Sequence, residues 1–218
     1  MGEPAAWLVN RPERDSGCWF LFAHGAGAPM DSEFMQVLAE KLAAQGVGVV
    51  RFEFPYMAER RATGGRRPPN KMGVLLAAFQ AQIDRVCSEL QPRALFIGGK
   101  SMGGRVASML AEENFTHGRI AGAVCLGYPF HPQGKPEKLR TEHLVGLTCP
   151  TLVVQGTRDA LGNREEVDGY PLSPAIECCW LDDGDHDFKP RRASGFTQSQ
   201  HWQSAAERAV AFMRAQES

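Results

Sequence analysis

Short apolar runs separated by longer amphipathic stretches are the feature of this sequence that most constrains its fold. Most of these runs are five to eight residues long and nearly continuously apolar, which is typical of strands buried on both faces of a parallel sheet. They predict strands at Ala6–Asn10, Cys18–Ala23, Val47–Phe52, Ala94–Gly98, Ile120–Gly127, Thr151–Gln155 and Ile176–Leu181. Because only a short polar segment joins the first two, we expect those two to pair antiparallel.

Stretches between and after these runs carry apolar residues at helical spacing. We expect helices from Asp31 or Ser32 to Gln45, with Gly46 as the stop, and over Asn70–Leu90, Ser101–Asn114 and His201–Ala215. Helices of this kind supply the crossovers that parallel strands need. The sequence therefore predicts one domain over residues 1–218, with a doubly wound, mostly parallel α/β sheet of about seven strands and helices on both faces.

Charge and composition exclude several classes of protein. The formal net charge is −1, so we expect no overall electrostatic attraction of the chain to nucleic acid or to an anionic membrane. None of the six cysteines forms a C-x-x-C pair, and we expect neither a zinc site nor a disulfide framework. The first residues lack the basic and apolar regions of a signal peptide, and no apolar run is long enough for a membrane span, so we expect neither feature. We expect a cytoplasmic monomer or homodimer that binds a small-molecule substrate.

The stretch GGKSMGGR, residues 98–105, lies where a predicted strand becomes a helix. It contains G-x-S-x-G, in which glycines allow a sharp turn that exposes the hydroxyl of Ser101 at a helix N-terminus. A phosphate-binding loop is the alternative, but it requires G-x-x-x-x-G-K-[ST]. Ala94 stands where the first glycine of that motif belongs. The spacing therefore favours a nucleophile turn.

Later loops supply partners for this serine. A triad of this type follows the chain order Ser, Asp or Glu, then His, and the loops after the last two predicted strands carry Asp159 and His186. Ser101 would attack, His186 would accept and return the proton, and Asp159 would orient the imidazole. Other histidines lie near helix ends or in short connections. Rival acids beside the histidine are Asp182, Asp183, Asp185 and Asp187.

A tetrahedral intermediate needs backbone N–H donors for its oxyanion. The residue after the nucleophile, Met102, is the first expected donor, and Ala26 in the glycine-rich turn HGAG is the second. Lys100 precedes the serine. Because neighbouring side chains of an extended segment point to opposite faces, we expect Lys100 to point away from the Ser101 hydroxyl and to form a structural ion pair.

Together HGAGA, GKSMGG, GTRD and GDHDF resemble the α/β-hydrolase fold, and within it the small, capless, dienelactone-hydrolase-like serine hydrolases. RFEFPYM, GRRPP and GYPFHPQGKPEKLR further resemble a bacterial group of α/β-hydrolases related to hydrolase-like domains of some eukaryotic chromatin-associated proteins. The resemblance implies a hydrolase without metal or cofactor. Dienelactone hydrolases proper use Cys where this chain has Ser101. Some eukaryotic relatives are thought not to be enzymes, which keeps a binding module as an alternative.

Two segments at the same edge of the sheet are candidates for substrate contacts. The basic stretch 51–71 follows the third predicted strand, and its arginines either bind a substrate anion or pair with surface acids in a solvated loop. The stretch after the fifth predicted strand either lines an acyl pocket or packs over the sheet. The expected substrate contacts are His24, Arg60, Arg61, Arg66, Arg67, Phe130 and His131.

About 23 residues separate Tyr128 from Thr151, which is too short for the substantial lid domain often inserted at this point of the fold. An open, shallow site follows, suited to small or soluble esters. The leading hypothesis is a serine hydrolase acting on a small acyl ester or thioester through an acyl-enzyme. The alternatives are a catalytically silent hydrolase-like binding module and an aminopeptidase-like hydrolase whose arginines hold a carboxylate.

Overall fold

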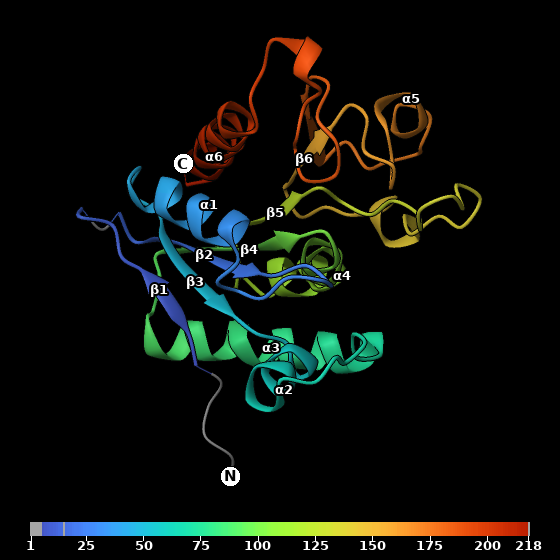
Figure 1. Cartoon of the computed structure of the whole chain (residues 1–218). Helices are drawn as coiled ribbons and strands as arrows, with labels where there is room; N and C mark the ends of the chain where they lie inside the picture. Colours follow the sequence, from blue (N-terminus) through green and yellow to red (C-terminus); the bar gives the residue numbers. More distant parts are fainter. Residues whose placement is uncertain (1–5, 15, 218) are drawn as a thin grey trace.

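The computed structural model describes residues 6–14 and 16–217. Over these residues one sheet has the strand order β1-β3-β2-β4-β5-β6-β7 (Figure 1). All neighbouring pairs are parallel except β1 with β3, which confirms the predicted, mostly parallel seven-stranded sheet. The strands are β1 Leu8–Asn10, β2 Cys18–Ala23, β3 Gly48–Phe52, β4 Ala94–Lys100, β5 Gly122–Leu126, β6 Thr151–Gly156 and β7 Ile176–Leu181.

The pairing of the first strand differs from the prediction. Val9 of β1 lies opposite Val50 of β3 in an antiparallel register, so β1 and β2 do not form a hairpin. Both edges of β2 are occupied by parallel partners, β3 and β4, which helical crossovers bring to it. Strand β1 therefore pairs with the outer edge of β3, which the crossovers leave free.

Helices cover both faces of the sheet (Figure 1). Helix α1, Glu33–Ala43, and helix α6, Gln198–Ala215, pack together on one face. Helix α3, Met72–Glu89, and helix α4, Met102–Thr116, cover the other. Successive side chains of a strand point to opposite faces. Phe20 therefore packs under α1 and α6, whereas its neighbour Leu21 packs against the layer of α3 and α4.

Two short helices are absent from the sequence prediction. Helix α2, Pro55–Thr63, lies inside the basic stretch, and helix α5, Arg164–Val167, follows β6. Only Tyr56 and Met57 of α2 are buried, so the helix has almost no apolar periodicity to detect. A sequence feature that indicates α2 is Pro55, because proline is favoured at the first position of a helix. Helix α6 begins three residues earlier than predicted, because Thr197 and Gln200 form a capping box.

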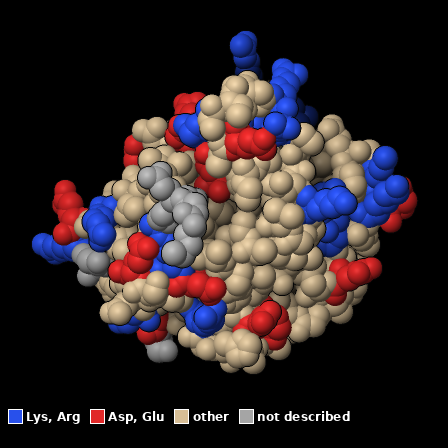
Figure 2. All heavy atoms as spheres, turned by 90° about the horizontal axis from the view of Figure 1, so that it is seen from below, with Lys and Arg blue, Asp and Glu red and all other residues tan. Residues whose placement is uncertain are grey.

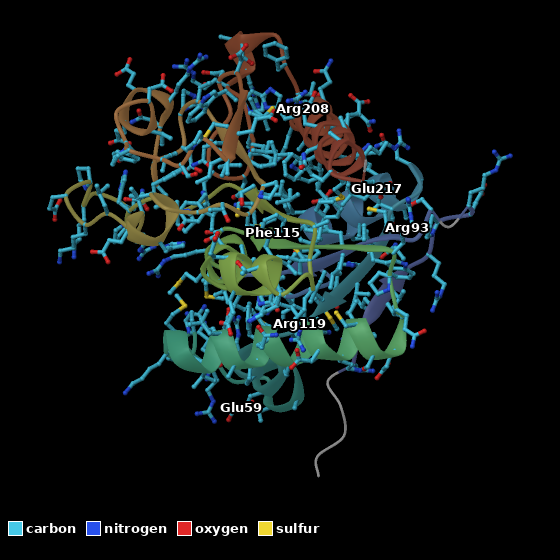
Figure 3. The ribbon with its side chains drawn as sticks, turned by 180° about the vertical axis from the view of Figure 1, so that it is seen from behind. Glu59, Arg93, Phe115, Arg119, Arg208 and Glu217 are labelled. Carbon is cyan, nitrogen blue, oxygen red and sulfur yellow. The ribbon has the colours of Figure 1, made fainter. Side chains whose placement is uncertain are left out.

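The carboxyl edge of the sheet stays open. Between β5 and β6 the chain forms only the 3₁₀ turn Glu142–Leu144, and no lid is inserted there. None of the helices in the described part of the chain is long and apolar enough to cross a bilayer. Seen from the α3 side, charged groups of both signs are spread around the rim of the face (Figure 2). On the back, Arg93 pairs with Glu217 at 2.8 Å and ties the start of β4 to the chain end (Figure 3).

Gly98 in the centre of β4 gives a stability prediction. A Cβ atom at this position would lie 1.9 Å from the Val124 carbonyl oxygen and 2.8 Å from the Phe20 ring. Gly98→Ala must therefore push β4 away from β5, and we expect a loss of about 3 kcal/mol or more in the free energy of unfolding. Gly73→Ala on α3 is the matched control, since nothing lies within 4 Å of its added Cβ. That variant should be unchanged or up to about 1 kcal/mol more stable. Urea unfolding measures both, and equal midpoints for Gly98→Ala and wild type would contradict the packing argument.

Candidate active site

Ser101 stands at a strained turn between β4 and α4. Its backbone has φ 51° and ψ −114°, a conformation that costs energy in a residue with a side chain. The turn is possible because two glycines leave room for the backbone. A Cβ atom at Gly99 would lie 2.5 Å from the Gly103 carbonyl carbon, and one at Gly103 would lie 2.6 Å from the Ala23 carbonyl oxygen. The turn thus presses directly against the end of β2.

The structure brings Ser101, His186 and Asp159 into one hydrogen-bonded series. His186 Nε2 lies 2.9 Å from Ser101 Oγ, and His186 Nδ1 lies 2.8 Å from Asp159 Oδ2. A carboxylate only accepts hydrogen bonds, so the Nδ1 atom carries the proton that Asp159 binds. The Nε2 lone pair is then free to accept the Ser101 hydroxyl proton. This is the arrangement that activates a serine nucleophile.

Asp159 is fully buried and held by donors other than the histidine. The Leu161 N–H donates to Oδ1 at 2.8 Å, and the Gln155 side-chain amide donates to Oδ2 at 2.9 Å. The same amide group contacts the carbonyls of Tyr128 and Gly162, and its oxygen accepts from the Tyr128 N–H. Gln155 was missed by sequence reasoning. The sequence feature that could have indicated it is a polar residue at the end of the predicted apolar strand Thr151–Gln155.

The neighbouring acids have other partners. Asp183 pairs with Arg158 and Arg191, and the bond to Arg191 lowers the pKa of this carboxyl to about 2. Asp185 accepts hydrogen bonds from the backbone N–H groups of residues 187 and 189. It therefore shapes the loop of His186 without contacting the imidazole.

Lys100 anchors this histidine loop from the strand side. Its ammonium donates to the His186 carbonyl oxygen at 2.7 Å and pairs with Asp187 at 3.3 Å. The ring of Phe34 lies 5.5 Å away. Burial lowers the pKa of the lysine, and the nearby Asp187 opposes that shift. The ion pair is the structural role expected from the sequence.

A pocket of about 350 Å³ opens beside the serine. The turn after β2 forms one wall, and the histidine loop and α1 form the others. Its lining residues are Gly25, Ala26, Gly27, Ala28, Ser32, Phe34, Met35, Lys100, Ser101, His186 and Asp187. A larger hollow of about 720 Å³ lies at the amino edge of the sheet, around Arg11 and Gly46, where parallel sheets do not bind ligands.

His24 supports the pocket wall from within and does not line the pocket. Its side chain is fully buried, the Phe54 N–H donates to Nε2 at 3.1 Å, and Nδ1 lies 2.6 Å from the Gly25 carbonyl oxygen. Nδ1 therefore carries the proton and donates it to that carbonyl. Burial lowers the pKa of His24 and keeps the ring neutral. The sequence predicts that His24 contacts the substrate, and this prediction is wrong. His24 lies inside the protein and stabilises the turn 24–28.

Phe130 and His131 are also absent from the pocket lining. Phe130 is fully buried, with its ring centroid 4.8 Å from that of Tyr128. His131 is 2% exposed, and its Nε2 lies 3.2 Å from a Glu166 carboxylate oxygen. The prediction that these two residues line an acyl pocket is therefore wrong. Both pack over the end of the sheet. Gly162 approaches Phe130 so closely that no side chain fits between them.

Four of the five arginines in the basic stretch lie in and after α2, and the structure divides them. Arg61 binds both Glu53 and Asp31, and Arg67 binds Glu59. The bonds to Glu53 and Asp31 raise the pKa of Arg61, and the bond to Glu53 contributes more. Arg60 and Arg66 line a separate small pocket. None of the four contributes to the lining of the serine pocket.

A second serine–histidine contact offers a contrast with the first. Ser108 Oγ on α4 lies 2.9 Å from His143 Nε2, but the hydroxyl donates its proton to the Arg105 carbonyl. His143 must therefore donate to Ser108 and cannot serve as its base. Burial lowers the pKa of His143 to about 4, and Ser108 is 1% exposed. This pair is structural.

Comparison with known proteins identifies the family. A model of the alpha/beta hydrolase domain matches residues 17–214. Solved structures similar to this chain include an α/β serine hydrolase homologue from Coxiella burnetii, at 17% identity and TM-score 0.71, covering 94% of this chain and 89% of that one. A dienelactone hydrolase from Anabaena variabilis has 19% identity and TM-score 0.72, with coverages of 96% and 90%.

A serine hydrolase without a lid from Xanthomonas campestris has 16% identity and TM-score 0.65, and the alignment covers 96% of both chains. These likenesses confirm the predicted fold. The family match extends over almost the whole sequence, from just before β2 to the last turn of α6. The protein therefore belongs to the α/β hydrolase domain family.

Proposed function

We propose that the protein is a serine hydrolase that cleaves a small acyl ester or thioester through a Ser101–His186–Asp159 triad. The observation that carries the proposal is the pair of hydrogen bonds, 2.9 Å and 2.8 Å, that joins the three side chains beside an open pocket. A strained serine turn supports the same conclusion, because backbone strain is concentrated at functional sites.

Acylation begins when Ser101 Oγ attacks the carbonyl carbon of the substrate. The hydroxyl proton passes to His186 Nε2, and the new imidazolium is stabilised by the buried carboxylate of Asp159. The tetrahedral intermediate then collapses. The bond to the leaving alcohol or thiol breaks, His186 returns the proton to it, and the acyl group stays on Ser101. Water activated by the same imidazole hydrolyses this acyl-enzyme in the second half-reaction.

Backbone N–H groups of Ala26 and Met102 are the proposed donors to the oxyanion. Met102 is the first residue of α4, so its N–H has no intrahelical acceptor. Ala26 lines the serine pocket, and its N–H makes no hydrogen bond to another described residue. Its carbonyl accepts the Tyr56 hydroxyl at 2.9 Å. The peptide plane of the Ala26 N–H is held through the Gly25 carbonyl of the same peptide unit, which accepts hydrogen bonds from His24 Nδ1 at 2.6 Å and from the Tyr56 hydroxyl at 3.3 Å.

The pocket favours small acyl groups. Its volume of about 350 Å³ is at the lower end of the range for ligand sites, and no lid closes over it. Phe34 and Met35 supply an apolar wall, and the charged lining residues Lys100 and Asp187 pair with each other at 3.3 Å. Short acyl esters and thioesters fit this combination better than long lipid chains do.

Labelling with a fluorophosphonate probe tests the proposal. Ser101 Oγ should displace fluoride from phosphorus and form a stable adduct, with the proton going to His186. Peptide mass mapping of wild-type protein should place the adduct on Ser101 and leave the buried Ser108 unmodified. Absence of labelling, together with inactivity on a panel of short esters and thioesters, would overturn the proposal in favour of a binding module. Activity on peptides alone would favour the aminopeptidase-like alternative.

A further inference from the structure

Two arginines near the serine pocket have no partner among the described residues. Arg60 lies in the last turn of α2, which ends at Gly64 with φ 70°. That turn leads the chain back so that Arg66 lines the same pocket. Neither guanidinium forms an ion pair or a hydrogen bond with any residue in 6–14 or 16–217, whereas Arg61 and Arg67 are both paired.

The pocket lined by these arginines has a volume of about 250 Å³. Pro29 and Met57 supply its apolar surface, and Arg61 and Glu53 also line it. Glu53 is almost fully buried and, together with Asp31, holds Arg61 in place. The pocket is thus lined by three guanidinium groups and by one carboxylate, Glu53, which Arg61 already binds. The pocket therefore holds positive charge that no acidic side chain in the described part of the chain neutralises.

One segment forms walls of both pockets. Gly25 to Ala28 line the serine pocket, and Pro29, the next residue, lines the arginine pocket. The three Cα–Cα steps from Ala26 to Pro29 span at most about 11 Å. Tyr56 of α2 donates its hydroxyl to the carbonyls of Gly25 and Ala26, so the arginine helix is bonded directly to the wall of the serine pocket. An extended substrate of about this length reaches from one pocket wall to the other.

We propose that the arginine pocket is a subsite for an anionic group of the substrate, located at the end remote from the bond that is cleaved. The planar guanidinium groups of Arg60 and Arg66 suit a carboxylate or a phosphate, which they bind through paired N–H donors. The substrate class is then an ester or thioester whose acyl part ends in an anion. This inference rests on the proposed hydrolase activity.

A matched pair of substrates tests the subsite. The 4-nitrophenyl monoester of adipic acid ends in a carboxylate, and the corresponding monoamide ester is neutral and nearly the same shape. Wild-type protein should hydrolyse the anionic ester with the higher kcat/KM. The double variant Arg60→Gln, Arg66→Gln should lower the ratio of the two kcat/KM values about 10-fold or more, since each lost bond joins charged groups. Added salt should lower the wild-type ratio.

Arg67→Gln is the control, because Arg67 pairs with Glu59 and does not line the pocket. Glu59 lies at the outer edge of α2 (Figure 3). This variant should keep the wild-type ratio. Inorganic phosphate as a competitor distinguishes the two anions: a rise in KM for the adipate ester in wild type, absent in the double variant, identifies a phosphate-binding subsite as well. If phosphate does not raise KM, the anion that the subsite binds is a carboxylate.

Two results separate this inference from the proposed function. Equal kcat/KM for the anionic and neutral esters, with fluorophosphonate labelling intact, would overturn the arginine subsite alone. An equal loss of the ratio in Arg67→Gln would do the same, because it would show a general effect of surface charge. Absence of both hydrolysis and labelling would instead overturn the serine hydrolase on which the subsite depends.

Discussion

Ser101→Ala is expected to lower kcat for 4-nitrophenyl acetate by about 10⁵–10⁶-fold, because no other group can carry the acyl intermediate. The variant removes the Oγ atom that lies 2.9 Å from His186 Nε2. Alanine keeps the Cβ atom, so the strained turn costs the same in both proteins. Thermal unfolding should therefore be nearly unchanged, and the fluorophosphonate adduct should disappear.

Ser108→Ala is the matched control for this prediction. Ser108 also contacts a histidine, but it is buried on α4 and its hydroxyl donates to a backbone carbonyl. The folded variant should retain kcat within about threefold of wild type, with about 1–3 kcal/mol lost from the free energy of unfolding because the His143 N–H loses its acceptor. Retention of more than a hundredth of the wild-type kcat by Ser101→Ala would show that another group is the nucleophile.

Asp159→Asn is expected to lower kcat about 10⁴-fold with little change in KM. The Leu161 N–H binds Oδ1, so the asparagine oxygen should stay there. The new NH₂ group would then face His186 Nδ1 and Gln155 Nε2, which lie 2.8 Å and 2.9 Å from Oδ2. To accept that donor, His186 must move its proton to Nε2. It can then no longer take the proton of Ser101.

Steady-state kinetics on short esters measures this loss, and circular dichroism checks that the variant folds. Asp182→Asn provides the comparison, because Asp182 is an exposed acid that precedes the same histidine and has no partner among the described residues. Its kcat should lie within about twofold of wild type. The assignment of the triad acid would be wrong if Asp182→Asn were the slower of the two.

The sequence predicts the fold and the triad loops because both depend on strand positions. Strands β2 and β7 have the predicted bounds, and parallel strands carry their carboxyl ends to one edge. The loops after β4, β6 and β7 therefore lie at the same edge of the sheet, and this does not depend on how the side chains pack. The same argument fails for β1, whose partner depends on which sheet edge remains free after the crossovers form.

Side-chain directions in loops could not be predicted in the same way. His24 and Phe130 follow strands and lie at the carboxyl edge, yet both are fully buried. Their orientation depends on contacts with Phe54 and Gly162, which come from distant parts of the chain. The arginines pose the same problem. Nothing in the order of Arg60 and Arg61 shows that only the second meets Glu53 and Asp31.

The amide of Gln155 has a consequence for how this protein can diverge. It bonds Asp159 and, at the same time, the backbone of Tyr128 and Gly162. Mutations that remodel the loop after β5 will therefore disturb the triad acid and carry a cost in rate. The segment after α2 has no such bond to the triad. New substrate preferences should accumulate there first, both in natural descendants and in laboratory selections, because catalysis survives the change.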